Sequence, residues 1–290
     1  MPETVRPLRS VLYMPASNAR ALDKARALPA DGLILDLEDA VAPAAKESAR
    51  ALALAALAQG GYGWRELVLR VNGPGTPWHE ADLAAAARSG ADAVLLPKVE
   101  TGAAVLEAER ALAAAGAPTG MPLWCMIETP RGVLAAAEIA AASPRVACLV
   151  AGTSDLVKDL RARSTAGRGE VATSLGLVLL AARAHGRAAL DGVHLDVTDD
   201  AGLEAACRHG RDLGFDGKTL VHPRQIEAAN RAFSPSEDEI TWARRAVEAH
   251  AAASRAGAGV VVVDGRLVEA LHVAEAERLL ALADALAGRG

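Results

Sequence analysis

The chain has 290 residues, of which 51% are hydrophobic and 23% are charged. This composition supplies enough apolar material for a large core and excludes extensive disorder. The formal net charge of −5 gives no electrostatic footprint for nucleic acid, and residues 1–7 lack the apolar core of a signal peptide. No long uncharged apolar run predicts a membrane span, so we expect a cytoplasmic protein with neither nucleic-acid nor membrane partners.

Eight apolar runs predict β-strands, and stretches rich in Ala and Leu with helical periodicity separate them. The predicted strands cover about residues 9–14, 32–37, 67–71, 92–97, 122–128, 146–151, 192–196 and 217–221. Helical segments are expected at 44–58, 80–89, 103–115 and 132–142. Such alternation is typical of a parallel sheet with right-handed crossovers.

Two architectures share this alternation, a doubly wound open sheet and a (β/α)8 barrel. The open nucleotide-binding sheet carries a glycine fingerprint after its first strand, but this chain reads Tyr13-Met-Pro-Ala-Ser-Asn18 there. We therefore predict an α/β fold of the (β/α)8 TIM barrel type, with a C-terminal helical extension.

The extension begins after the eighth predicted strand, which divides the chain into a barrel domain, residues 1–233, and an extension, residues 234–290. A capping box, Ser236 with Glu239, opens a helix that runs to about Ser254. A strand-like segment at 260–263, a turn at Asp264-Gly265 and a last helix at 270–287 follow. Because a barrel closes without such a tail, we expect it to cover the mouth or to contact another subunit.

The cysteines are three in number, and none lies at metal-ligand spacing from a histidine or another cysteine. Cys125 and Cys148 fall inside predicted strands, where a free thiol behaves as a small hydrophobic group. We expect buried structural cysteines.

Charged or polar side chains end at least five of the predicted strands. They are Asp36, Glu38 and Asp39 after the second, Arg70 and Asn72 at the third, Lys98 after the fourth, Glu128 at the fifth and Asp155 after the sixth. The carboxyl ends of barrel strands converge on one mouth, so this pattern predicts a shared active site.

Glu128 and Asp155 lie at adjacent strand ends and are separated by one helix. Two carboxylates can share one Mg²⁺, which leaves its other positions to water and to substrate oxygens. The alternative is that each carboxylate caps the next helix, since Thr153-Ser-Asp155 suits an N-cap. The neighbouring polar strand ends favour the metal.

Arg70 is flanked by apolar residues, and its guanidinium suits a bidentate grip on a substrate carboxylate or an oxyanion. A structural ion pair with Asp36, Glu38 or Asp39 is the alternative, and both can hold at once. Asp36 and Glu38 share one strand face, so one of them is expected to bond metal-bound water or Arg70. For Asp39 a solvated loop is the alternative.

Further polar residues extend this ring or lie beside it. Lys98, Asp196 and His222 follow the fourth, seventh and eighth predicted strands, and a histidine there fits a structural hydrogen bond as well as catalysis. Arg20 and Lys24, four residues apart on one predicted helix, suit the phosphates of a large anionic substrate or an ordinary solvated face.

Seven short motifs in fixed order resemble those of the citrate lyase β-subunit-like family, which includes malyl-CoA and citramalyl-CoA lyases. They are the segments 12–18, 36–41, 69–72, 96–98, 127–129, 152–155 and 221–226, and the resemblance runs from about residue 8 to the C-terminus. It implies a (β/α)8 barrel, Mg²⁺ on Glu128 and Asp155, and a substrate-binding arginine at Arg70. It also implies substrate contacts at Gly152, Thr153 and Ser154, CoA contacts at Arg20 and Lys24, and a homotrimer or hexamer.

In the acyl-CoA lyases of that family, a C-terminal segment of the neighbouring subunit brings a catalytic aspartate over the mouth, within a pattern like Gly-x-Met-Ile-Asp-x-Pro. This chain reads Gly265-Arg-Leu-Val-Glu-Ala-Leu271, so Glu269 stands at the aspartate position and Leu271 at the proline. Glutamate keeps the carboxylate but places it about one methylene further out, which affects a proton transfer that depends on geometry.

The resemblance implies a Mg²⁺-dependent carbon–carbon lyase that cleaves a 3-hydroxy acyl-CoA of malyl or citramalyl type to acetyl-CoA and a 2-oxo acid. Arg70, Glu269, Asp36 and Glu38 are its expected catalytic residues. The alternatives are a malyl-CoA thioesterase, the citryl-cleaving β subunit of a citrate lyase complex, and an aldolase acting on 2-oxo acids without CoA. A binding module without catalysis is a further alternative.

Overall fold

The computed structural model describes residues 6–289, which form two compact units. One unit runs from Leu8 to Phe233 and the other contains the chain from Ser234 onward. No helix of the described part is long and apolar enough to cross a membrane.

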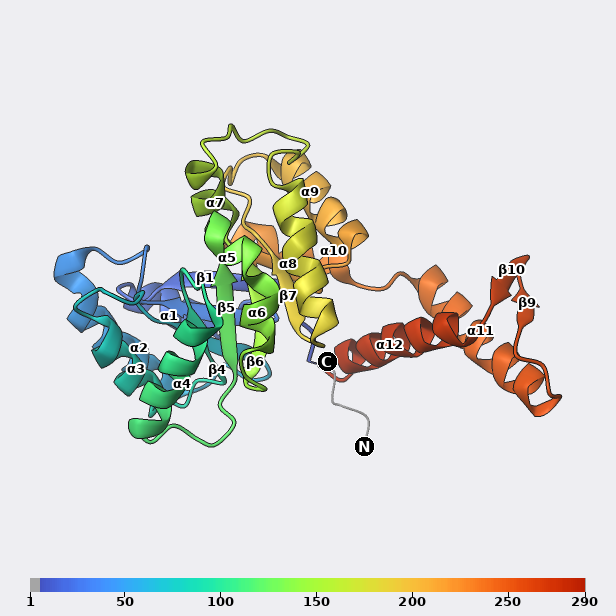
Figure 1. The fold of residues 1–290 in the computed structure, drawn as a ribbon, viewed down its shortest axis with the longest axis horizontal. Coiled ribbons are helices and arrows are strands. Elements are labelled where there is room, and N and C mark those ends of the chain that lie inside the picture. The colour runs from blue at the N-terminus through green and yellow to red at the C-terminus, as the bar shows by residue number, and fades with distance from the viewer. Residues whose placement is uncertain (1–5, 290) are drawn as a thin grey trace. The chain divides into compact units, whose positions relative to one another are not determined.

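The first unit is a closed barrel of eight parallel strands that follow one another in chain order (Figure 1). Its strands are β1 Ser10–Pro15, β2 Gly32–Asp36, β3 Glu66–Arg70, β4 Ala93–Leu96, β5 Leu123–Ile127, β6 Val146–Ala151, β7 Ala188–Asp191 and β8 Gly217–Leu220. Pairing of β8 with β1 closes the ring. The TIM barrel predicted from the alternation is confirmed.

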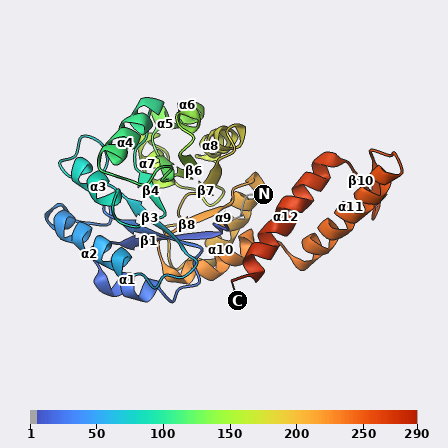
Figure 2. The ribbon, with the colours of Figure 1, turned by 90° about the horizontal axis from the view of Figure 1, so that it is seen from below.

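Helices surround the strands on all sides of the barrel (Figure 2). They are α1 Ala19–Ala25, α2 Lys46–Gln59, α3 His79–Ala86, α4 Gly102–Ala114, α5 Pro130–Leu134, α6 Ala136–Ala141, α7 Thr153–Asp159, α8 Ala172–Ala184, α9 Asp200–Leu213 and α10 Ile226–Phe233, with short 3₁₀ turns at Pro43–Ala45 and Pro223–Gln225. The helix expected at 132–142 is divided in two because Ala135, at φ −96° and ψ 5°, leaves helical geometry.

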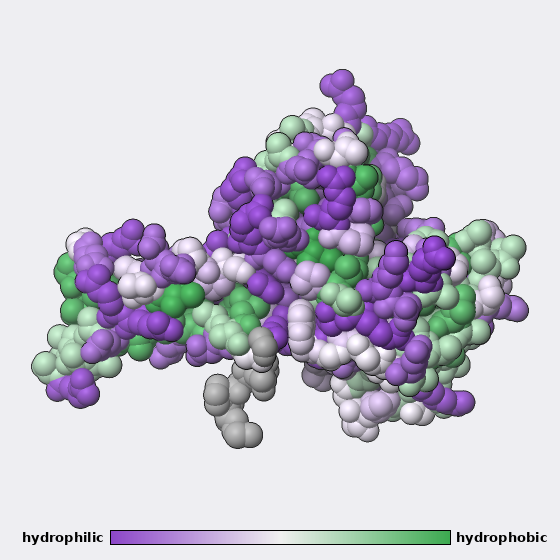
Figure 3. Space-filling model, turned by 180° about the vertical axis from the view of Figure 1, so that it is seen from behind, coloured by the Kyte–Doolittle hydropathy of each residue, from purple (hydrophilic) through white to green (hydrophobic). Residues whose placement is uncertain are grey.

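Strand alternation sorts the barrel side chains into two apolar layers. Ile34, Val68 and Met126 pack inside the barrel, whereas Leu33, Leu35 and their counterparts pack against the helices. Two residues further along each inward-facing row come Asp36, Arg70 and Glu128. The polar side chains at the mouth therefore lie next to the apolar side chains that fill the barrel interior. Outside, hydrophilic residues dominate much of the surface (Figure 3).

The seventh strand lies earlier than predicted, and the expected strand at 192–196 is wrong. Strand β7 ends one residue before Gly192, where a Cβ would collide with the Thr153 side chain, and the chain continues as an irregular loop. Asp196, expected at a strand end, is an exposed loop residue that accepts hydrogen bonds from Thr198. The acid that does end β7 is Asp191.

The second unit contains α11 Glu237–Arg255, β9 Val261–Val263, β10 Arg266–Val268 and α12 Ala270–Ala287. Ser236 and Glu239 form the predicted capping box, with hydrogen bonds of 3.2 and 2.7 Å. The segment expected as one strand is half of an antiparallel hairpin. Asp264 at φ +50° and Gly265 at φ +76° make the two-residue turn whose twist suits paired strands.

Candidate active site

Arg70 is clamped by two acids from the end of β2. Residues Asp36 and Arg70 are direct partners across β2 and β3, and the guanidinium donates to both carboxylate oxygens, at 2.7 Å from Nε and 2.6 Å from Nη2. Its third nitrogen, Nη1, lies 2.8 Å from Glu38 Oε2. Burial alone would lower the pKa of Arg70, but Asp36 outweighs it and the pKa is raised. The ion pair considered from the sequence is present, and Arg70 stays charged.

Tyr13 supports the guanidinium from within the barrel. The ring centroid lies 4.8 Å from the Arg70 guanidinium carbon, which permits a cation–π contact. Burial raises the pKa of the Tyr13 hydroxyl, and this group has no hydrogen-bond partner in the described part of the chain. Arg70 is thus held on one edge by Asp36 and across its plane by an aromatic ring.

Lys46 holds the loop that carries Glu38. Its buried ammonium donates to Leu37 O at 2.8 Å, to Glu38 O at 2.7 Å and to Asn72 Oδ1 at 2.6 Å. Asp36 accepts at 2.9 Å from the Glu38 main-chain N–H. These bonds fix the turn after β2 and so fix where the Glu38 carboxylate points.

Asn72 ties this loop to the next helix. Its main-chain and side-chain N–H groups donate to Asp82 Oδ2 at 3.0 and 2.6 Å, and Arg50 Nε donates to the other oxygen at 2.6 Å. A continuous chain of bonds therefore links helices α2 and α3 to the ends of β2 and β3.

Glu128 is the buried carboxylate on the opposite wall. Its Oε1 accepts from the Lys98 main-chain N–H at 2.7 Å. Burial, together with the negative charge of Glu38, raises the pKa of Glu128 to about 8, and Asp155 adds to this shift. Asp155 is half-buried in the first turn of α7. The two acids predicted to share a cation thus lie close enough to repel each other electrostatically.

Helix capping does not account for either acid. Thr129 caps α5, since its Oγ1 accepts from Gly132 N at 3.0 Å, and Glu128 takes no part. Helix α7 has no side-chain cap bond, and Asp155 lies 4.0 Å from Lys158 Nζ, the next residue on the same helix face.

The donor set fits Mg²⁺. Glu128 is buried and Asp155 is half-buried, and the pKa of Glu128 is raised first by burial and then by the negative charges of Glu38 and Asp155. Within residues 6–289 there is no cluster of three or more His, Cys, Asp or Glu side chains suited to a metal. Mg²⁺ accepts one or two carboxylates and completes its shell with water and substrate oxygens, so a pair suffices.

Similarity to known proteins identifies the family of this chain. Residues 9–223 match the HpcH/HpaI aldolase/citrate lyase family. The chain belongs to this family.

A protein named (3S)-malyl-CoA thioesterase from Cereibacter sphaeroides strain KD131 is 51% identical over 99% of this chain and 98% of its own length. Citrate lyase subunit beta of Escherichia coli K12 is 37% identical over 95% of this chain and 93% of its own. The crystal structure of CitE from Mycobacterium tuberculosis in complex with magnesium, acetoacetate and coenzyme A superposes with a TM-score of 0.75, at 35% identity over 96% of this chain and 98% of that one.

The remaining predicted residues of this family member lie in different surroundings. Thr153 is buried, Ser154 is exposed, and Asp39 is an exposed residue 3.7 Å from Arg70. Arg20 and Lys24 are exposed on α1. Glu269 belongs to the second unit, where it starts α12 and its main-chain N–H donates to His272 Nδ1 at 3.1 Å.

His222 has a local structural role at the start of the 3₁₀ turn Pro223–Gln225. Its Nδ1 accepts from Arg224 N at 3.2 Å, and Gln225 Oε1 accepts from the His222 N–H at 3.3 Å. The structural reading of this histidine agrees with these bonds.

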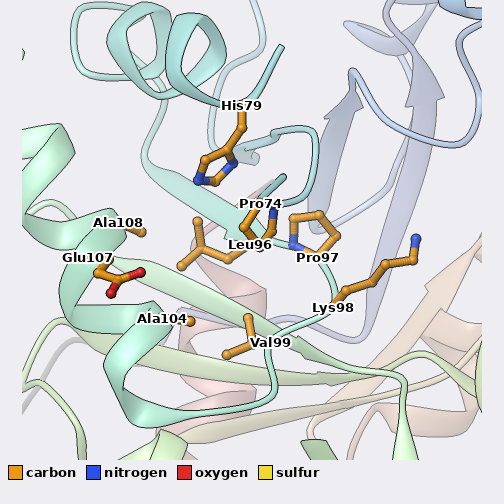
Figure 4. Close-up of a pocket in the computed structure, with 9 residues that line it drawn as sticks. All are labelled: Pro74, His79, Leu96, Pro97, Lys98, Val99, Ala104, Glu107 and Ala108. Atoms are coloured by element: carbon orange, nitrogen blue, oxygen red, sulfur yellow. The ribbon is translucent and has the colours of Figure 1, made fainter. Parts of the chain in front are cut away.

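A small cavity of about 40 Å³ lies beside the end of β4, next to the mouth. Its lining is mainly apolar, with His79 and Glu107 as polar exceptions, and His79 Nδ1 lies 2.7 Å from Asn72 O. Figure 4 shows the Lys98 side chain running away from the apolar lining, although its backbone forms part of the cavity rim.

Sequence reasoning missed Lys46 and Tyr13. A signal for Lys46 existed, because it falls on the buried stripe of α2 together with Ala49, Ala53 and Ala56. A charged residue on such a stripe must find partners inside the protein.

Proposed function

We propose that the chain is a Mg²⁺-dependent enzyme acting on a CoA thioester of malyl type, with hydrolysis of the thioester as its reaction. The observation that carries the proposal is the buried Glu128, with the half-buried Asp155 near it, in the same barrel mouth as a clamped arginine. Identity of 51% with relatives named (3S)-malyl-CoA thioesterase, against 37% for citrate lyase subunit beta, favours hydrolysis over carbon–carbon cleavage.

Glu128 and Asp155 would hold the cation. When bound, Mg²⁺ supplies Lewis-acid polarisation of the carboxylate and hydroxyl oxygens of a hydroxy acid. Magnesium in CitE from Mycobacterium tuberculosis supports this assignment.

Arg70 would bind an anionic oxygen of the substrate. Asp36 and Tyr13 fix its plane, so little side-chain entropy remains to be lost on binding. In this proposal Asp36 and Glu38 orient the arginine, and Gly152, Thr153 and Ser154 line the approach of the acyl group. Arg20 and Lys24 would meet the phosphates of CoA.

Glu269 would act as the general base. In hydrolysis its carboxylate takes a proton from water, the water oxygen bonds to the thioester carbon, and the C–S bond breaks to release CoA. We propose that Glu269 is supplied by a neighbouring subunit of a homotrimer or hexamer, with residues 1–233 as the catalytic domain and 234–290 as the extension that delivers it.

A second candidate is the carbon–carbon lyase. The same base would take the proton of the substrate hydroxyl while the bond between the hydroxyl-bearing carbon and the carbon next to the thioester breaks. The hydroxyl carbon becomes the 2-oxo acid, and the proton returns to the enolate to give acetyl-CoA. The family name and the 37% identity with citrate lyase subunit beta support it. A citryl-cleaving subunit would need partner subunits, and an aldolase without CoA would turn over free hydroxy acids.

Product identification by mass separates these reactions. Purified protein is incubated with malyl-CoA, with and without Mg²⁺, and we expect free malate and CoA only when the metal is present. Glyoxylate with acetyl-CoA would instead establish the lyase. Asp155→Asn should abolish turnover while the unfolding temperature stays near that of the wild type, and full activity of this variant would remove the metal assignment.

A further inference from the structure

We infer that Lys98 is a positioning residue that holds Glu128 ready for the cation, and that it does so mainly through its backbone. The inference rests on the magnesium site proposed above. Three features of the Lys98 turn carry it: a left-handed backbone, contacts that hold Val99 and the Lys98 ammonium, and one hydrogen bond from Lys98 N to Glu128.

The backbone of Lys98 has φ +52°. This left-handed region is uncommon for residues other than glycine, because the Cβ atom crowds the backbone there. Such a conformation persists only where surrounding contacts determine it, and it occurs often at functional sites.

Contacts of the next residue, Val99, and of the Lys98 side chain hold this conformation. The next N–H, that of Val99, donates to Met126 O of β5 at 3.2 Å. Helix α5 packs against the Val99 carbonyl so closely that a Cβ on Gly132 would lie 2.5 Å from that oxygen. The ammonium of Lys98 donates to Glu38 Oε1 at 2.7 Å. Main chain and side chain are therefore both held.

The result is an N–H group aimed at a metal-binding carboxylate. Lys98 N lies 2.7 Å from Glu128 Oε1. On the other side the Gly152 backbone approaches so closely that a Cβ there would lie 2.3 Å from Glu128 Cβ and 2.9 Å from Oε2. Glu128 is confined between two backbone segments, which fixes the direction of its free oxygen before any ligand arrives.

The side chain of Lys98 performs a separate task. Glu38 Oε1 accepts a hydrogen bond from the Lys98 ammonium, and Glu38 Oε2 lies beside Arg70. Since the Lys98 main-chain N–H donates to Glu128, Lys98 links Glu128 to Arg70 through Glu38. Backbone and ammonium can be separated by substitution, because residue types differ in their tolerance of positive φ.

Glycine and asparagine adopt left-handed conformations readily, whereas valine and isoleucine resist them. The variants Lys98→Gly, Lys98→Asn, Lys98→Val and Lys98→Ile all lose the ammonium and differ in backbone preference. Calorimetric titration with MgCl₂ alone measures their affinity. We expect Gly and Asn to stay within about threefold of the wild type, and Val and Ile to bind about 10–100-fold more weakly.

Equal affinities of the valine and glycine variants would overturn the inference. So would a loss of about tenfold or more in both Lys98→Gly and Lys98→Asn, which would assign the effect to the ammonium. If the β-branched variants fail to fold, as thermal unfolding would show, the glycine and asparagine variants decide alone. A wild type that binds no Mg²⁺ removes the inference with the metal site, whereas Mg²⁺ binding without malyl-CoA hydrolysis removes only the proposed reaction.

Discussion

Two ionic clusters lie among the barrel strands and the loops that follow them, and they differ in the sign of their excess charge. The mouth cluster consists of Asp36, Glu38, Arg70, Lys98 and Glu128, and it faces into the barrel. The anchor cluster consists of Asp191, Lys218 and Arg168, and it lies between the barrel and α9.

In the anchor cluster a single carboxylate is paired with two cations. Asp191 and Lys218 are register partners on β7 and β8, and both are fully buried. Asp191 accepts from Lys218 Nζ and from Arg168 Nη1, each at 2.8 Å. Burial opposes ionisation, but the two cations outweigh it and lower the pKa of Asp191. This cluster fastens the loop between α7 and α8 to the barrel and offers no free site.

The mouth cluster is incomplete. Glu38 Oε2 lies near Arg70 without the geometry of a hydrogen bond to any described residue, and burial raises the pKa of Glu38. The pKa of Glu128 is raised to about 8, mainly by burial. Buried acids whose negative charge exceeds that of their cationic neighbours favour the binding of a further cation. We therefore interpret the anchor cluster as structural and the mouth cluster as a binding site for a cation.

The largest expected effect is a loss of folding stability when the anchor cluster is broken. Asp191→Asn leaves two cations without their carboxylate, Lys218 among them fully buried, and should lower the free energy of unfolding by about 3–5 kcal/mol. Urea denaturation measures this, with Asp196→Asn on the exposed loop as control. A loss below about 1 kcal/mol would show that the cluster does not anchor the barrel.

Glu128→Gln tests whether the mouth cluster serves ligand binding and not stability. Because the carboxylate is destabilised by burial, its removal should leave the metal-free protein as stable as the wild type or more stable at pH 9. Added Mg²⁺ should raise the unfolding temperature of the wild type and leave that of the variant unchanged. Strong destabilisation of the metal-free variant would mean that Glu128 is a structural acid.

Gly152→Ala should displace Glu128 without removing any charge. The new Cβ would lie 2.3 Å from Glu128 Cβ, so one of the two must move, and Mg²⁺ affinity should fall about 10–100-fold. Gly176→Ala on α8 is the matched control, since a Cβ there meets nothing within 4 Å. Unchanged affinity in Gly152→Ala would show that the site tolerates a repositioned carboxylate.

The last prediction concerns the pH dependence of Mg²⁺ affinity. The pKa of Glu128 is raised to about 8, so this carboxyl holds a proton at neutral pH that a cation must displace. Mg²⁺ affinity should rise by up to about tenfold per pH unit below pH 8 and level off above it. For the same reason Glu128 makes the metal-free protein less stable as pH rises from about 4.5 to 8. An affinity that does not change between pH 6 and pH 8 would contradict the raised pKa.

The barrel could be predicted from the sequence because the alternation of strands and helices is a local pattern. The shared site could be predicted as well, because a barrel brings the polar ends of its strands together at one mouth. The sequence pattern misplaced β7, since the short run at 188–191 carries less signal than the apolar residues after it, and this hid Asp191. The left-handed turn at Lys98 was not predictable, because contacts from β5 and α5 impose it. The bonds of Lys46 likewise depend on residues 8 to 26 positions away.

The central claim is that the mouth cluster is completed by one divalent cation bound to Glu128 and Asp155. Calorimetric titration of the wild type and of Glu128→Gln with MgCl₂ at pH 8 tests it most directly. We predict one Mg²⁺ per chain for the wild type and no saturable binding for the variant. Equal binding by the two proteins, or none by the wild type, would contradict the account.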